Sequence, residues 1–135
     1  MAYFEWDEKY SVKVPTVDNE HKKLFELING FYAAIANKGA NSALSELVEG
    51  LRAYTVYHFT HEEKMMQQAR YGGLATQQAA HKSFVDKVTD IQKRIQDGKL
   101  VVSMEMTSFL KSWLTEHILK LDTKYSESMM AASIR

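Results

Sequence analysis

The chain has 135 residues, enough for one domain with a sizeable core. Its 17 basic and 17 acidic residues balance to a net charge of zero, so no overall field recruits nucleic acid or anionic lipid. Cysteine is absent, which excludes disulfides and thiolate ligands, so a metal would have to be held by histidine and carboxylate. That ligand set suits iron, manganese or zinc.

The sequence also bears on where the protein acts. The amino-terminal stretch "MAYFEWDEKYSV" is acidic and aromatic and lacks the apolar core of a signal peptide. No apolar stretch approaches the ~20 residues that a membrane span needs. We therefore expect a cytoplasmic monomer with no nucleic-acid or membrane partner; the sequence indicates no protein partner.

From the amino terminus, residues 1–17 show no sustained period, and we expect an arm that packs through its aromatic side chains. Apolar residues then recur at three- and four-residue steps over 18–37, 41–69, 74–97 and 103–121, which predicts four amphipathic helices and a short tail. Asp18 is the expected N-cap of the first helix. Short connections favour an all-α fold, an up-down-up-down four-helix bundle forming a single domain over 1–135.

Four of the five histidines fall on the apolar faces, one on each helix: His21, His58, His81 and His117. One inward histidine is more often a satisfied core residue than a metal ligand. Four unpartnered imidazoles, however, would each cost about 1–3 kcal/mol to bury. A metal ion between them would offset that cost.

Two carboxylates strengthen the prediction of a metal site. Glu62 follows His58 by one turn, so both project from one helix face; its neighbour Glu63 reads as a solvated surface acid. Asp122 follows His117 by five residues, which places it about 140° around the helix. Asp122 can meet His117 only if the helix bends, ends or tightens there. The six residues together predict a buried metal centre.

The stretches that carry these residues are "VDNEHKKLFELIN", "HFTHEEKMM", "AAHKSF" and "WLTEHILKLD". In order and spacing they resemble the hemerythrins, and the single-domain bacterial members in particular, along nearly the whole chain. The resemblance implies a non-haem di-iron centre, completed by an oxo or hydroxo bridge, that binds dioxygen reversibly. It further implies the metal ligands: His21 and His58 on the iron with the open position, His81 and His117 on the other, and Glu62 and Asp122 bridging the two.

The chain departs from the family at Gln77, since hemerythrins usually have a histidine four residues before the one that matches His81. Three outcomes fit: the amide oxygen is a weak ligand, water fills an open position on the second iron, or the second iron binds poorly. We favour water or a weak amide ligand. His61 is expected beside the centre rather than on it. Apolar residues that could wall the dioxygen pocket, or simply pack the core, are Leu24, Phe25, Phe59, Trp113 and Ile118.

The function predicted from this resemblance is reversible dioxygen binding, as a carrier, a store or a deliverer of oxygen. An alternative is a di-iron enzyme that reacts with peroxide or nitric oxide, which an open position at Gln77 would favour. A redox or dioxygen sensor is a further alternative. The sequence alone leaves open whether the protein is an enzyme, although the absence of a recognisable substrate site favours an oxygen-binding protein.

Overall fold

A computed structural model of the chain describes residues 4–36, 41–97 and 104–132. Within them, four long helices follow one another: α1 (Pro15–Ala36), α2 (Asn41–Gln68), α3 (Leu74–Gln96) and α4 (Met104–Lys120). A 3-10 turn, η2 (Asp122–Tyr125), and a short helix, α5 (Ser126–Ala131), complete the carboxyl end. The described residues contain no strand, so the predicted all-α class is confirmed. The helix ends expected at residues 37 and 103 lie outside the described residues.

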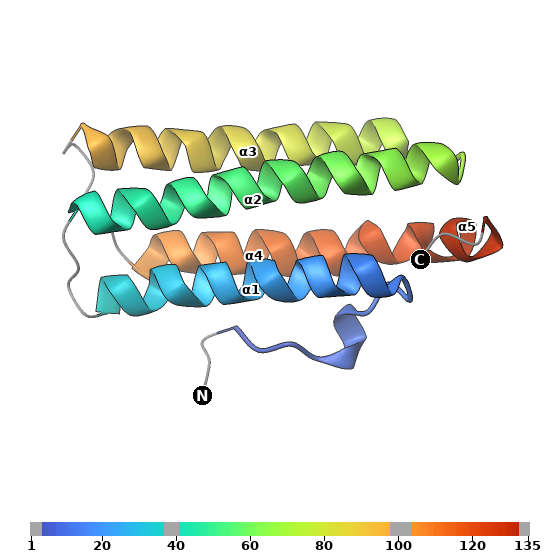
Figure 1. Cartoon of the computed structure of the whole chain (residues 1–135), viewed down its shortest axis with the longest axis horizontal. Helices are drawn as coiled ribbons and strands as arrows, with labels where there is room; N and C mark the ends of the chain where they lie inside the picture. The colour runs from blue at the N-terminus through green and yellow to red at the C-terminus, as the bar shows by residue number, and fades with distance from the viewer. Residues whose placement is uncertain (1–3, 37–40, 98–103, 133–135) are drawn as a thin grey trace.

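The four long helices lie side by side with nearly parallel axes (Figure 1). α2 packs against both α1 and α3, and α1 also packs against α4. The chain reverses between α2 and α3 at Arg70, whose φ of 53° is the left-handed conformation that often ends a helix. The predicted four-helix bundle is therefore the observed fold. The four helices surround one common interior.

The first helix begins earlier than the sequence suggested. α1 starts at Pro15, a residue whose fixed φ suits the first turn of a helix, so Asp18 lies inside that turn and the predicted N-cap was wrong. The Asp18 carboxylate instead accepts hydrogen bonds from the Val12 backbone N–H at 2.9 Å and from Ser11 Oγ at 2.6 Å. Asp18 thus fastens the preceding arm to α1.

The amino-terminal arm contains one 3-10 turn, η1 (Glu8–Tyr10), and runs beside α1 (Figure 1). Phe4 stacks on Phe25 of α1 with ring centroids 3.7 Å apart, and Tyr10 meets the same ring edge-on. Asn29 both accepts from and donates to the Phe4 backbone. The arm therefore packs against α1 through these rings and also contacts α4 through η1.

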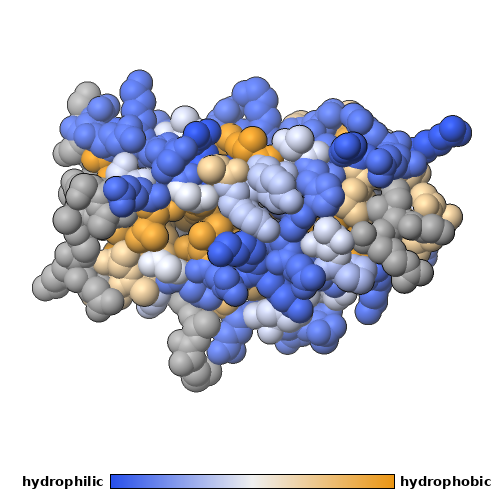
Figure 2. Space-filling view, viewed as in Figure 1, coloured by the Kyte–Doolittle hydropathy of each residue, from blue (hydrophilic) through white to orange (hydrophobic). Residues whose placement is uncertain are grey.

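The core follows the apolar faces of the helices. Each aliphatic or aromatic side chain removed from water contributes about 1.5–3 kcal/mol, so the helices are held mainly by these faces. On the face seen in Figure 2, hydrophilic side chains predominate and apolar ones show mainly in the seams between helices. Among the described residues, no helix has the length and apolar content needed to cross a membrane.

Candidate metal centre

Six polar side chains meet in the interior of the bundle, although apolar groups surround them. Each of α1, α2, α3 and α4 contributes a histidine, α2 adds a glutamate, and η2 adds an aspartate; all six are buried: His21, His58, Glu62, His81, His117 and Asp122. They form two groups. Within each group, the potential ligand atoms all lie within 4.8 Å of one another. The first is His21, His58 and Glu62, and the second is Glu62, His81, His117 and Asp122.

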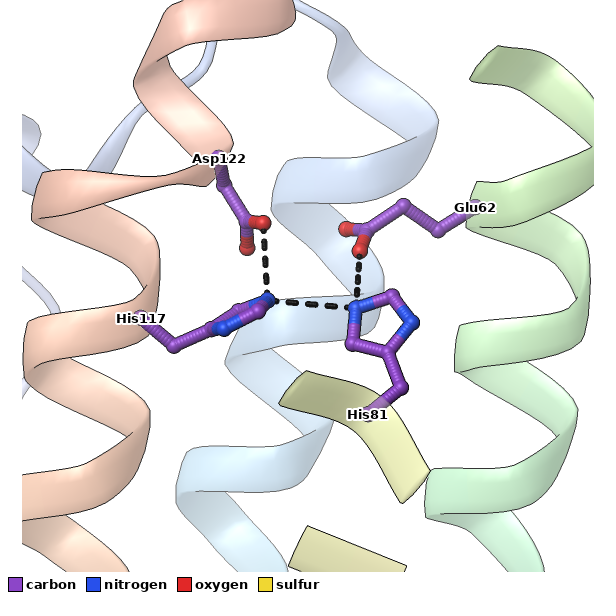
Figure 3. A group of neighbouring side chains, drawn as sticks. All are labelled: Glu62, His81, His117 and Asp122. Atoms are coloured by element: carbon purple, nitrogen blue, oxygen red, sulfur yellow. Dashed lines mark hydrogen bonds and ion pairs between the residues drawn. The ribbon is translucent and has the colours of Figure 1, made fainter. Parts of the chain in front are cut away.

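Glu62 belongs to both groups because its two oxygens face opposite ways. Glu62 Oε2 lies 3.4 Å from His21 Nε2 and 3.3 Å from His58 Nε2. Glu62 Oε1 lies 3.0 Å from His81 Nε2 (Figure 3). One carboxylate therefore spans the two groups, as a ligand shared between two ions would.

Asp122 spans the same two groups from the opposite side. Its Oδ2 lies 3.3 Å from His21 Nε2, and its Oδ1 lies 3.1 Å from His117 Nε2 (Figure 3). The five-residue spacing from His117 is accommodated because α4 ends at Lys120 and the chain tightens into η2, which begins at Asp122. The helix therefore ends where the sequence required it to end or tighten for this contact.

The geometry fits a pair of metal ions. In octahedral coordination, two neighbouring ligand atoms that are each about 2.1 Å from one ion lie about 3.0 Å apart. The nitrogen–oxygen distances above are close to that value, and His81 Nε2 lies 3.1 Å from His117 Nε2. Four of the converging atoms are buried without a hydrogen-bond partner among the described residues: His21 Nε2, His58 Nε2, Glu62 Oε1 and Asp122 Oδ2. Buried polar atoms in this state are what a cation would satisfy.

Two further carboxylates hold the imidazoles from outside, and the sequence did not reveal either role. Glu20 of α1 accepts from His58 Nδ1 at 2.7 Å, and Glu63 of α2 accepts from His81 Nδ1 at 2.8 Å. The expectation that Glu63 is a solvated surface acid was therefore wrong; its side chain is only 24% exposed. An imidazole that donates from Nδ1 presents its Nε2 lone pair to a metal, so both carboxylates fix the ligating tautomer.

His61 lies outside both groups. Its Nδ1 is 2.6 Å from Glu20 Oε2, so it shares the carboxylate that holds His58. Its side chain is 33% exposed, whereas Glu20 beside it is buried. His61 therefore lies beside the centre and reaches it through Glu20.

Tyr125 is the third residue whose role the sequence did not reveal. It lies in η2, three residues after Asp122, and its fully buried hydroxyl donates to Glu62 Oε2 at 2.8 Å. The sequence had predicted only a short tail in this region. Its aromatic ring at a helical step from Asp122 was the available signal, although only the 3-10 turn brings the hydroxyl to Glu62.

The buried carboxylates of the centre stabilise positive charge on the imidazoles beside them. Burial alone would lower the pKa of His58, but the charge of Glu62 and the hydrogen bond to Glu20 outweigh it and raise that pKa to about 10. Burial likewise opposes ionisation of Glu62, yet the surrounding imidazoles hold its pKa well below the usual value. Burial and the nearby carboxylates raise the pKa of Tyr125, which therefore remains a neutral donor.

Aromatic rings wall the second group. Phe59 stacks on His81 with centroids 3.8 Å apart, and Trp113 stacks on His117 at 4.6 Å. Of the other predicted pocket residues, Leu24 and Ile118 are buried in the core. Phe25 is different, since its ring contacts are with the amino-terminal arm.

Gln77 lies at the second group. It is 1% exposed on α3, one turn before His81, and its Nε2 donates to Asp122 Oδ1 at 2.9 Å. Its Oε1 is buried and has no hydrogen-bond partner among the described residues. The amide is therefore part of the centre rather than a solvated surface group.

Comparisons with known proteins agree with this geometry. The family model described as "Hemerythrin HHE cation binding domain" matches residues 12–127. The chain belongs to the hemerythrin family. It is 31% identical over 132 residues to the bacteriohemerythrin of Methylococcus capsulatus, which covers 97% of this chain and 100% of that protein. This hemerythrin-family chain is also 30% identical to the myohemerythrin of Sipunculus nudus, over 90% of each chain.

The fold is shared with solved hemerythrin structures. A crystal structure of wild-type hemerythrin superposes with a TM-score of 0.89 at 30% identity, and the match covers 95% of this chain and 98% of the other. Because the similarity spans nearly all of both chains, this chain and that hemerythrin share the same arrangement of four helices.

Proposed function

We propose that this protein holds two non-haem iron ions in the bundle interior and binds dioxygen reversibly. The observation that carries the proposal is the sharing of Glu62 and Asp122 between two groups of buried imidazoles, with one oxygen of each carboxylate facing each group. Two adjacent ions joined by carboxylates account for that arrangement. Membership of the hemerythrin family supports iron and dioxygen as the metal and the ligand.

In this proposal, His21 and His58 would hold the first ion, which would be the one that binds dioxygen. His81 and His117 would hold the second ion, and Glu62 and Asp122 would be ligands shared by the two. The two carboxylates, with a bridging oxide or hydroxide, cancel most of the charge of two ferrous ions, which makes the pair far less costly to bury.

When bound, the two irons supply the electrons that dioxygen takes up and returns. The protein's own residues set the conditions for that exchange. Glu20 and Glu63 keep the imidazoles in the ligating tautomer. Phe59 and Trp113 cover His81 and His117 with apolar rings, which keeps out the water that promotes irreversible oxidation of the iron.

The test is to load the purified chain with ferrous iron under argon, count iron per chain, and record optical spectra as oxygen is admitted and removed. We expect two irons per chain and a visible charge-transfer band that appears with oxygen and disappears on deoxygenation. Zinc-loaded protein is the control and should show no such band. A band that never reverses, together with peroxide turnover, would support the enzyme alternative instead.

We also propose that residues 1–135 form a single hemerythrin-like domain that acts as a monomer in the cytoplasm. The length of 135 residues supports a single domain. Light scattering coupled to size-exclusion chromatography should give the mass of one chain; a dimer mass would contradict the monomer.

A further inference from the structure

Gln77 is positioned by a residue of the proposed second metal position. Its Nε2 donates to Asp122 Oδ1 at 2.9 Å, and that same oxygen lies 3.1 Å from His117 Nε2. Rotating the amide by half a turn would set Gln77 Oε1 against the carboxylate, and two acceptor oxygens repel each other. Asp122 therefore fixes which end of the amide faces it, and the amide oxygen points elsewhere.

Gln77 Oε1 is buried without a hydrogen-bond partner among the described residues, and several atoms of the proposed metal ligands share that property. Among them are His58 Nε2, Glu62 Oε1 and Asp122 Oδ2. A buried amide oxygen without a donor is costly, and a cation is an alternative partner for it. In this centre, the unpartnered atoms are mostly those that would face an ion.

We propose that Gln77 Oε1 is a ligand of the second ion, and that this oxygen makes the second position accept manganese(II) more readily than a third imidazole would. The inference rests on the proposed function only for the two metal positions. Both positions share Glu62 and Asp122, and each has two imidazoles, so the amide oxygen is the protein atom that distinguishes them. Carbonyl and carboxylate oxygens suit manganese(II), whereas imidazole favours zinc(II).

The proposal is tested by metal binding in the absence of iron. Manganese(II) is titrated into the full chain under argon, and the free ion is followed by its electron paramagnetic resonance signal; zinc(II) competition then gives the ratio of the two affinities. The variants are Gln77→Glu, Gln77→Leu and Gln77→His. Gln78→Glu is the matched control, because Gln78 is the neighbouring glutamine and is exposed. Circular dichroism confirms that each variant is folded.

We expect Gln77→Glu to bind manganese(II) at least tenfold more tightly and Gln77→Leu at least tenfold more weakly, in the range that ligand-sphere changes produce, about 10–100-fold. Gln77→His should move the preference toward zinc(II) by a similar factor. Gln78→Glu should change neither affinity. If Gln77 served only to orient Asp122, Gln77→Glu would set two carboxylates together without a donor and would weaken binding. That opposite sign would overturn the proposal.

A crystal structure of the manganese-loaded wild-type chain gives a second, direct measurement that does not depend on any variant folding. Anomalous scattering should locate manganese between His81 and His117, with Gln77 Oε1 in its coordination sphere at a bonding distance of roughly 2.0–2.6 Å. An amide oxygen beyond that range would overturn the inference while leaving dioxygen binding by iron intact. A wild-type chain that bound neither iron nor manganese would overturn the proposed function as well.

Discussion

Replacing Tyr125 by phenylalanine tests whether the hydroxyl supports the centre through Glu62. The hydroxyl donates to Glu62 Oε2 at 2.8 Å, and both side chains are fully buried. Glu62 is ionised, because its neighbouring imidazoles hold its pKa well below the usual value against the opposing effect of burial. A hydrogen bond to a charged group contributes about 1.5–3 kcal/mol to stability. Tyr125→Phe should lower the free energy of unfolding of the metal-free protein by that amount.

For a chain of 135 residues, an unfolding entropy of about 2.1 cal/mol/K per residue is about 0.28 kcal/mol/K in total, so the melting temperature should fall by about 5–11 °C. The assay is thermal unfolding followed by circular dichroism in the presence of a chelator. Tyr57→Phe is the control, because that ring is 59% exposed and its replacement should shift the melting temperature by less than about 2 °C. A Tyr125→Phe protein that melted within that same interval of wild type would refute the role assigned to the hydroxyl.

Three other predictions follow from the same contacts. Glu63→Gln removes the charge beside His81 Nδ1 and should lower zinc affinity at the second position by about 10–100-fold, as measured by competition with a chelating dye. The control Glu26→Gln changes a side chain that is 73% exposed and should leave the zinc affinity unchanged. Glu62→Gln should reduce the uptake of both proposed ions in an elemental metal count, since Glu62 belongs to both groups. Loss of one ion alone would contradict the proposed bridging role. In metal-free protein, the pKa of His58 is raised from 6.5 to about 10. The protonated imidazole therefore contributes its full stabilisation below pH 6.5, and this contribution is lost as the pH rises toward 10. The melting temperature should decrease over that interval, and a constant melting temperature would contradict the assignment.

The sequence predicted the fold and the meeting of four histidines because both depend on one strong signal. Apolar residues at helical spacing mark the inward face of each helix, and His21, His58, His81 and His117 share those faces. Once the helices pack around a common interior, side chains on these faces have to approach one another. The departure at Gln77 was also visible, since its one-turn spacing from His81 places it on the same face.

The sequence did not reveal the residues that support the ligands, because their roles depend on contacts between distant segments. Glu20 and Glu63 are each adjacent in sequence to a predicted ligand. The sequence pattern does not distinguish a glutamate at such a position that faces solvent from one that faces an imidazole. Glu20 reaches His58 from another helix, 38 residues away in sequence. Tyr125 and Asp122 depend on the tightening of the chain into η2, which no periodicity in the sequence predicts.

The interior of this bundle is organised around positive charge, and protons can supply that charge when metal does not. Burial opposes the ionisation of both Glu62 and Asp122, and the charge of Glu62 also raises the pKa of Asp122. These effects are outweighed, so the pKa values of both carboxyl groups are lowered. The compensation comes from the imidazoles, and the raised pKa values of His21 and His58 are its counterpart. Metal ions entering the centre must therefore displace protons, so metal uptake and proton release are coupled.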